Sequence, residues 1–157
     1  MRSVSDWLRE YGASHENATN KLLHWLCVPP IVLSVMGLLW AIPVPAAVAG
    51  LSPWINWATL VALASIAYYI VLSPKLAFGV AISFVVLLVI VQWLATLPWP
   101  LWATSLAIFV VAWIGQFIGH AVEGKRPSFF KDVQFLLIGP LWLVAALYRG
   151  LGLKTES

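Results

Sequence analysis

Long apolar runs, separated by short polar or proline-containing turns, dominate the pattern of this chain of 157 residues. A helix needs roughly 20 apolar residues to cross a hydrocarbon core of about 30 Å, and several of these runs approach that length. The pattern predicts about four membrane-spanning helices, at residues 22–45, 54–72, 76–97 and 101–122. We therefore expect an all-α polytopic membrane protein whose full length, 1–157, forms a single membrane domain.

Two shorter segments flank these predicted spans. Apolar residues recur at helical spacing near the N-terminus, between charged positions, as is typical of a helix lying on a membrane surface. These apolar residues are Val4, Trp7, Leu8 and Tyr11. Near the C-terminus, the apolar run 133–148 has only 16 residues and contains Gly139 and Pro140. Its length and its break favour a re-entrant or interfacial hairpin packed against the bundle, with a short fifth helix as the alternative.

Two consecutive prolines, Pro29 and Pro30, interrupt the first predicted span. Proline has no amide hydrogen, so the carbonyls of Trp25 and Leu26 lose the donors that a continuous helix would supply. We expect a kink or break in the helix just beyond His24.

The composition supports a membrane protein and excludes several other classes. Hydrophobic residues make up 62% of the chain and charged residues 10%, against about 45–50% and 25% in soluble domains. A nucleic-acid-binding role needs a dense basic face, which a net charge of +3 spread along the chain does not provide. Cys27 is the only cysteine, so neither an intrachain disulfide nor a CxxC metal motif can form.

The basic residues predict the orientation in the membrane. Lys and Arg mark the cytoplasmic side of short loops, and four spans place the N-terminus, the Lys75 turn and the polar segment 123–132 on one side. That segment contains Lys125, Arg126 and Lys131, whereas the opposite loops, about 43–53 and 98–100, contain no Lys or Arg. We expect both termini to be cytoplasmic, in a bacterial inner membrane or in the endoplasmic reticulum.

The three histidines are the residues most suited to chemistry. His15 and His24 flank the entry to the first span and His120 ends the fourth, so the predicted topology brings all three to one face of the bilayer. His15 and His24 are nine residues apart and would point to opposite sides of one continuous helix. They can meet only if the chain bends between Gly12 and Asn20.

A second group of polar side chains shares a helix face with His120. Gln116, His120 and Glu123 are spaced at i, i+4 and i+7. Gln116 is a candidate to orient the imidazole of His120, and Glu123 is a candidate carboxylate ligand or base. Imidazole and carboxylate without thiolate suit Fe(II), Zn or Mn. For each histidine taken alone, the alternative without a function is a solvated side chain at the membrane interface.

Small residues accompany this face of the fourth span. Gly115 and Gly119 form a small-xxx-small pair, which permits close approach of a second helix. The six tryptophans near the opposite loops suggest an aromatic belt at the far interface. They are Trp40, Trp54, Trp57, Trp93, Trp99 and Trp102.

Two stretches carry a resemblance to a known family: YGASHENATNKLLHWLCVPP (11–30) and QFIGHAVEGKRPSFFKDVQFLLIGPLWL (116–143). Together they resemble the membrane-bound 2-hydroxy fatty acid dioxygenases of phytosphingosine breakdown. The resemblance implies an Fe(II)-dependent α-oxidation, with a 2-hydroxy fatty acid and O2 as substrates. The family's histidines match His15, His24 and His120, and its acidic position matches Glu123.

Other residues receive roles within this hypothesis. Lys21, Lys125 or Arg126 could neutralise the substrate carboxylate, and Lys21, Arg126 and Glu123 are the candidate catalytic residues. Asn20 and Gln116 would support the metal ligands. The acyl tail would stay among the helices or in membrane lipid, and assembly into a homo-oligomer is left open.

Three other classes compete with the enzyme hypothesis. A multi-histidine desaturase or hydroxylase needs roughly eight histidine ligands and is excluded by a chain with 3. A transporter is disfavoured because no inverted repeat is visible. The remaining alternative is a non-catalytic membrane scaffold or lipid-binding protein with incidental histidines.

Overall fold

The computed structural model describes residues 2–130 and 133–153, and over these residues it is all-helical. This confirms the predicted all-α class. The elements are, in chain order, α1 (Val4–Gly12), α2 (Ala18–Trp40), α3 (Ala46–Ala49), α4 (Trp57–Leu72), α5 (Pro74–Leu94), α6 (Leu101–Glu123), the short 3-10 helix η1 (Ser128–Phe130) and α7 (Phe135–Gly150).

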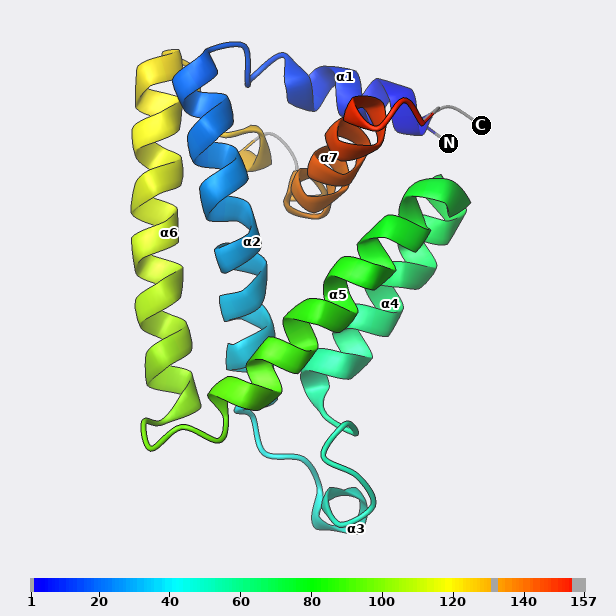
Figure 1. Ribbon diagram of the computed structural model, residues 1–157, viewed down its shortest axis with the longest axis vertical. Helices are drawn as coiled ribbons and strands as arrows, with labels where there is room; N and C mark the ends of the chain where they lie inside the picture. The colour runs from blue at the N-terminus through cyan, green and yellow to red at the C-terminus, as the bar shows by residue number, and fades with distance from the viewer. Residues whose placement is uncertain (1, 131–132, 154–157) are drawn as a thin grey trace.

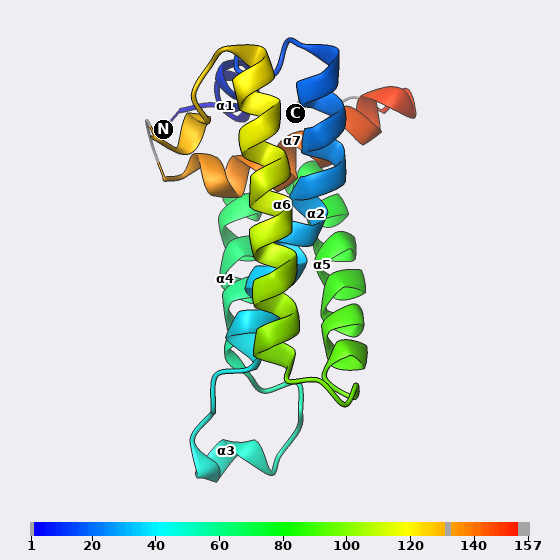
Figure 2. The same cartoon turned by 90° about the vertical axis from the view of Figure 1, so that its left-hand side faces the viewer.

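The longer helices form a bundle with two distinct ends. Helices α2 and α6 run antiparallel along each other, and α4 and α5 form a second antiparallel pair (Figure 1, Figure 2). Helix α2 also contacts both helices of the second pair. Helices α1 and α7 lie against each other across one end, which we call the α1 end; it also holds the start of α2, the end of α6 and the α4–α5 turn (Figure 1). The opposite end, which we call the α3 end, carries α3 and the α5–α6 loop (Figure 1).

Three of the described helices are long and apolar enough to cross a membrane. They are α2, α5 and α6, with mean hydropathies of 2.0, 2.5 and 1.8 over their most apolar windows. Only 17–33% of each window is buried inside the protein, so most of this apolar surface faces outward and requires lipid around it. The chain is therefore a helical membrane protein. Helix α4 has 16 residues, fewer than the roughly 20 that a spanning helix needs. The predicted count of four spans therefore stays a prediction.

Capping residues and prolines set the ends of α2. The side chain of Asn17 accepts a hydrogen bond from the amide of Thr19, so the helix begins at Ala18, earlier than the predicted residue 22. Its last residue is Trp40 rather than residue 45. Pro43 and Pro45 follow, and each disfavours helical backbone in the residue before it.

Side-chain caps also move the starts of α4 and α5. The Asn56 side chain accepts from the amide of Thr59, and α4 begins at Trp57 rather than at residue 54. Ser73 caps α5, which begins at Pro74, because proline lacks the amide hydrogen that the first helical position leaves unpaired anyway. Helix α5 ends at Leu94, before the predicted residue 97, whereas α6 matches its predicted range to within one residue.

The helix does not break at Pro29 and Pro30, so this half of the expectation is wrong, while a kink there stays a prediction. Helix α2 continues through both prolines from Ala18 to Trp40. Membrane helices tolerate proline because neighbouring helices and small backbone adjustments compensate for the missing hydrogen bonds, and α2 packs along the length of α6 (Figure 2).

The C-terminal apolar run is one short helix, so the favoured hairpin is wrong and its alternative is correct. Helix α7 packs against α1, α5 and α2, and Ile138, Leu141 and Ala145 on it are fully buried. Pro140 lies inside this helix. The Tyr69 hydroxyl donates a 2.8 Å hydrogen bond to the carbonyl of Leu137, which gives the backbone before this proline a partner from α4.

Close contact between α2 and α6 holds the start of α2 and the end of α6 at the same level along the bundle. A Cβ atom added at Gly119 would lie 2.5 Å from Asn20 Oδ1, and one added at Gly115 would lie 2.6 Å from Cys27 Sγ. Glycine at these two positions leaves room for the side chains of Asn20 and Cys27 where the helices are in close contact, as the small-residue spacing predicts. The start of α2 and the end of α6 are thereby held at the same level.

The observed topology agrees with the predicted grouping of basic loops. The first helix, the α4–α5 turn with Lys75 and the end of α6 share the α1 end (Figure 1). Lys131 lies outside the described residues. The tryptophans at the ends of α2 and α5 and at the starts of α4 and α6 lie toward the α3 end, where the rings of Trp40 and Trp54 meet with centroids 5.5 Å apart. Which end faces the cytoplasm stays a prediction.

Candidate metal centre

The structure brings the three histidines together at the α1 end. His15 follows α1, His24 lies in the second turn of α2, and His120 lies in the last turn of α6. The His15 ring centroid lies 4.5 Å from that of His24 and 4.9 Å from that of His120. All three side chains are buried, with 1%, 1% and 6% exposure. Since the three histidines are buried and adjacent, the alternative of solvated interfacial side chains does not describe them.

A turn between α1 and α2 directs His15 inward. The amide of Ser14 donates to the Tyr11 carbonyl and that of His15 to the Gly12 carbonyl, which reverses the chain before α2 begins. His15 Nδ1 lies 2.9 Å from the Tyr11 carbonyl oxygen. Because a carbonyl can only accept, Nδ1 carries the hydrogen and Nε2 keeps its lone pair, the arrangement usual in metal-binding histidines.

Each imidazole keeps one buried nitrogen without a hydrogen-bond partner: His15 Nε2, His24 Nδ1 and His120 Nδ1. Leaving a buried polar atom unpaired costs about 1–3 kcal/mol, so three such atoms in one cluster point to a ligand that pairs with them. Burial also lowers the pKa of His15, although its hydrogen bond to Tyr11 and the charge of Glu123 act in the opposite direction. The neutral imidazole that results is the form that binds metals.

The imidazole nitrogens of the cluster are suitable donors for a metal ion. Their positions in the structure do not yet form a coordination sphere. Among residues 2–130 and 133–153, no three His, Cys, Asp or Glu side chains are already arranged to hold an ion. Small rotations of the rings about their side-chain torsions are therefore needed before three nitrogens share one ligand. The match rests on the buried, unpartnered nitrogens rather than on preformed geometry.

Aromatic side chains enclose the histidines, and the sequence pattern did not single them out for the site. The Tyr11 ring stacks on His15 with centroids 4.6 Å apart, and its hydroxyl lies 3.5 Å from His24 Nε2. Trp142 of α7 lies 5.6 Å from His15 and 5.4 Å from His24. The one available signal was the spacing of Tyr11 four residues before His15, which places both on one side of the chain.

Gln116 and Asn20 are both buried beside the histidines. Gln116, expected to orient His120, lies next to the His24 ring, and its side-chain nitrogen has no hydrogen-bond partner. Asn20 is 0% exposed and donates to the carbonyl of Ser14 and to Glu123. Asn20 therefore connects the turn that carries His15 to the end of α6.

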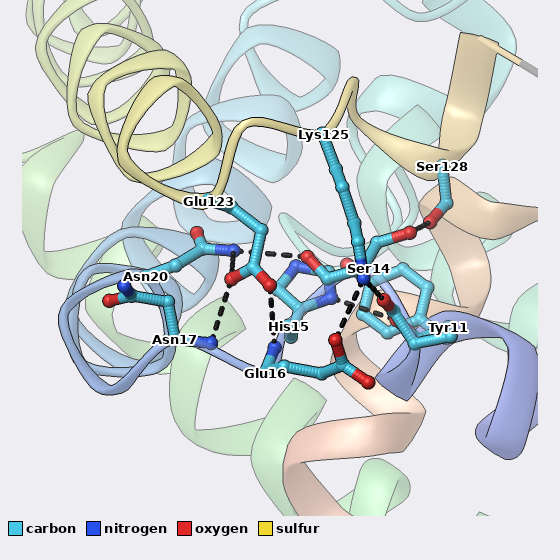
Figure 3. Close-up of polar contacts among 10 residues, drawn as sticks. Tyr11, Ser14, His15, Glu16, Asn17, Asn20, Glu123, Lys125 and Ser128 are labelled. Carbon is cyan, nitrogen blue, oxygen red and sulfur yellow. Dashed lines mark hydrogen bonds and ion pairs between the residues drawn. The ribbon is translucent and has the colours of Figure 1, made fainter.

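Glu123 is engaged with the start of α2 rather than with the imidazoles (Figure 3). Its Oε1 accepts from the amide of Glu16 at 3.0 Å, and its Oε2 accepts from the amide of Asn17 at 2.9 Å and from Asn20 Nδ2 at 3.0 Å. A carboxylate at a helix N-terminus also interacts favourably with the helix dipole. The candidate ligand or base thus holds the end of α6 against the turn that carries His15.

Lys125 and Ser128, which follow α6 in the chain, also contact the turn between α1 and α2 (Figure 3). Lys125 Nζ donates to the Ala13 carbonyl at 2.7 Å and to Glu16 Oε2 at 2.8 Å, and the hydrogen bond to Glu16 raises the pKa of Lys125. The hydroxyls of Ser128 and Ser14 lie 3.1 Å apart and are buried. We call these contacts, together with those of Glu123, the clasp.

The other predicted cationic residues lie outside the cluster. Lys21 is exposed on the first turn of α2, close enough for its charge to act on His15. Arg126 is exposed and, with Lys125, lines an open groove of about 510 Å³ whose wall includes His120. Arg126 is therefore the predicted cation best placed beside an opening that reaches a histidine.

A small internal cavity of about 60 Å³ lies against the histidine cluster and is lined in part by Tyr11, His24, Gln116 and His120. We call it the histidine cavity. Because one water needs roughly 10–15 Å³ by this kind of measure, the space is large enough for a small polar group. Mainly apolar residues of α2, α6, α7 and η1 form the rest of its wall, together with Pro127 and the polar Ser128.

Fold and site together define a helical membrane protein with a buried histidine-lined cavity at one end of its bundle. The family described as 2-hydroxy-palmitic acid dioxygenase Mpo1-like matches residues 1–151, and the chain belongs to this family. A relative in Saccharomyces cerevisiae, named 2-hydroxy-palmitic acid dioxygenase MPO1, is 26% identical over 144 residues, which cover 90% of this chain and 78% of the relative. No solved structure shows a significant match to the chain.

Proposed function

We propose that this protein is an iron-dependent dioxygenase that converts a 2-hydroxy fatty acid to the fatty acid one carbon shorter. The observation that carries the proposal is the cluster of three buried imidazoles, each with an unpartnered nitrogen. The family membership and the printed name of the yeast relative support the reaction class.

The proposed reaction balances without a further co-reactant. A 2-hydroxy acid and O2 give the shortened acid, carbon dioxide and water. The bond between C1 and C2 breaks, C1 leaves as carbon dioxide, and C2 becomes the new carboxyl carbon. The substrate loses four electrons, which is the number that full reduction of O2 accepts.

His15, His24 and His120 would hold the metal in this scheme. Bound Fe(II) would supply the redox chemistry and the open coordination positions that reaction with O2 requires. Tyr11 and Trp142 pack against the imidazoles and would limit the access of water to them. The clasp keeps His15 opposite His120 by tying the turn after α1 to the end of α6.

Arg126 is the candidate to bind the substrate carboxylate. It lies in the groove that reaches His120, and its guanidinium can form paired hydrogen bonds with a carboxylate. Lys21 would add positive charge near His15. Lys125 already pairs with Glu16 and serves the clasp.

Metal analysis and oxygen uptake test the proposal directly. Detergent-purified wild type should contain about one iron per chain and consume oxygen with 2-hydroxypalmitate but not with palmitate, which lacks the 2-hydroxyl group. His120→Ala should lose both properties. A matched control, Thr96→Ala, changes an exposed hydroxyl at the α3 end and should retain both. Wild type that binds no iron and consumes no oxygen would overturn the proposal and favour the scaffold or lipid-binding alternative.

A further inference from the structure

A second, larger cavity lies deeper in the bundle, beyond the histidine cavity. Its volume is about 290 Å³, and helices α2, α4, α5, α6 and α7 contribute to its wall. The lining is almost entirely apolar, with small side chains from α4 at Ala58 and Ala62. Among residues 2–130 and 133–153, no histidine or charged side chain lines it.

The two cavities are neighbours because they share part of their walls. The shared residues are Ile31, Val32, Trp113, Leu136 and Pro140. Trp113 is prominent among them, since it also lines a lateral groove on the outside of α6. A ligand with a polar head in the histidine cavity could therefore extend an apolar tail past Trp113 into the deeper cavity.

We propose that the deeper cavity is a pocket for the acyl tail of the substrate and that its far end limits the tail length. We call it the tail pocket. The proposal rests on the proposed function, because that function places the polar head of a 2-hydroxy fatty acid at the histidines. The occupant is a single saturated chain.

The dimensions of α2 fit a chain of about sixteen carbons. Met36 and Leu39, the last two residues of α2 in the wall of the pocket, lie twelve and fifteen residues beyond His24, which is about 18–22 Å along a helix that rises 1.5 Å per residue. An extended covalent chain advances about 3.3–3.6 Å per three bonds, so a sixteen-carbon chain with fifteen bonds spans about 17–18 Å. A tail of this length reaches from the histidine cluster to the level of Met36.

Selection in this pocket is steric. The tail is in an apolar medium in the membrane as well as in the pocket, so burial adds little free energy in favour of a longer chain. A chain that is too long must instead displace packed side chains at the far end. Changing the free length of the pocket should therefore shift chain-length preference, because one methylene in a well-packed pocket can alter specificity by about 10-fold or more.

Ala62→Phe is the variant that shortens the pocket. Ala62 is 3% exposed and lines the pocket, so a phenyl ring at this position extends into the cavity. Ala64→Phe is the matched control, because Ala64 lies on the same helix with its side chain exposed on the outside of the bundle. Met36→Ala is a second variant, which lengthens the pocket because it removes most of a side chain from the wall.

The experiment measures kcat/KM for 2-hydroxy acids of eight to eighteen carbons, together with competitive binding of the non-oxidisable acids octanoate and palmitate. For Ala62→Phe we expect the sixteen-to-eight-carbon ratio of kcat/KM to fall about 10-fold or more, with a matching loss of palmitate binding. Ala64→Phe should keep the wild-type profile. Met36→Ala should shift the preference toward eighteen carbons, which keeps the test valid should Ala62→Phe fail to fold.

The outcomes separate the tail pocket from the reaction itself. If wild type oxidises 2-hydroxy acids while Ala62→Phe and Met36→Ala keep its chain-length profile, the tail pocket is overturned and the proposed function stands. If no protein consumes oxygen but Ala62→Phe selectively loses palmitate binding, the pocket stands and the proposed function fails. Equal palmitate binding in all variants indicates that lipid or solvent surrounds the tail, and it also overturns the pocket.

Discussion

The two ends of the bundle are built on different principles. At the α1 end, side chains form hydrogen bonds to residues more than 100 positions away in sequence, as from the Asn17 amide to Glu123 or from Lys125 to Glu16. At the α3 end of the part of the chain that the structure describes, side-chain hydrogen bonds join residues much nearer in sequence, 3 positions apart for Asn56 and Pro53 and 14 for Trp57 and Pro43. Long-range polar contacts are thus concentrated where the histidines meet.

The difference shows which end is organised to position chemistry. Buried polar side chains cost free energy unless they are paired, and the α1 end buries His15, Asn20, His24, Gln116 and His120 within one cluster. At the α3 end, large aromatic side chains such as Trp99 and Trp102 are exposed, which suits contact with a membrane interface. One end gathers the candidate site, and the other presents exposed aromatic side chains.

The largest effect is expected from the histidines. His15→Ala, His24→Ala and His120→Ala should each reduce bound iron to background and lower oxygen uptake by about 100-fold or more, and any double variant should be no worse than a single one. Ligands of one ion act as a unit, so their losses do not add. The measurements are metal content and initial rates. Trp99→Ala at the α3 end is the control, and independent, mild effects of the three histidines would contradict a shared site.

A smaller effect is expected where α2 and α6 make close contact. Gly119→Ala places a Cβ atom against Asn20 and Leu23, and overpacking of this kind costs about 1–3 kcal/mol. We expect a lower melting temperature in detergent and weaker iron binding, because Asn20 also belongs to the clasp. Gly50→Ala at the α3 end meets no atom within 4 Å and should melt like wild type. Equal melting of the two variants would show that close helix approach does not support the site.

Glu123→Gln distinguishes a clasp residue from a metal ligand. The amide cannot accept all three hydrogen bonds, so we expect a loss of roughly 1–2 kcal/mol in stability while most of the iron is retained. Loss of iron as complete as in His120→Ala would instead identify Glu123 as a ligand. Glu16→Gln is the control. Its ion pair with Lys125 is exposed, so water screens it and its loss should change stability little.

The smallest effect is expected from the Tyr11 hydroxyl. Tyr11→Phe keeps the ring that stacks on His15 but removes the oxygen beside His24. A long, neutral hydrogen bond contributes about 0.5–1 kcal/mol, so oxygen uptake should fall about two- to fivefold with iron content unchanged. Tyr11→Ala removes the ring as well and should be clearly worse. If the two variants behaved alike, the hydroxyl rather than the ring would matter.

Local sequence features determined much of the helical framework. Apolar run length predicted α2, α4, α5 and α6, because a helix is the structure in which an apolar segment satisfies its own backbone in lipid. The cap at Asn17 and the end of α1 at Gly12 also follow from local residue type, because asparagine favours the N-cap and glycine weakens a helix. The exact bounds shifted where Asn56 or Pro43 set a helix end that the apolar pattern alone does not mark.

Tertiary packing decided the rest. The chain continues as a helix through Pro29 because α6 supports it, and residues 135–150 form one helix because α1 and α5 cover it. The pattern of apolar residues does not report such contacts.

For the site, the sequence supplied the three histidines and the topology that places them at one end. It did not reveal that Tyr11 and Trp142 enclose them or that the carboxylate of Glu123 holds the turn before α2. These roles depend on distances between segments more than 100 residues apart in the chain. Residue type and spacing determine which side chains can bind a metal, and only the packing of α1, α2, α6 and α7 decides which of them meet.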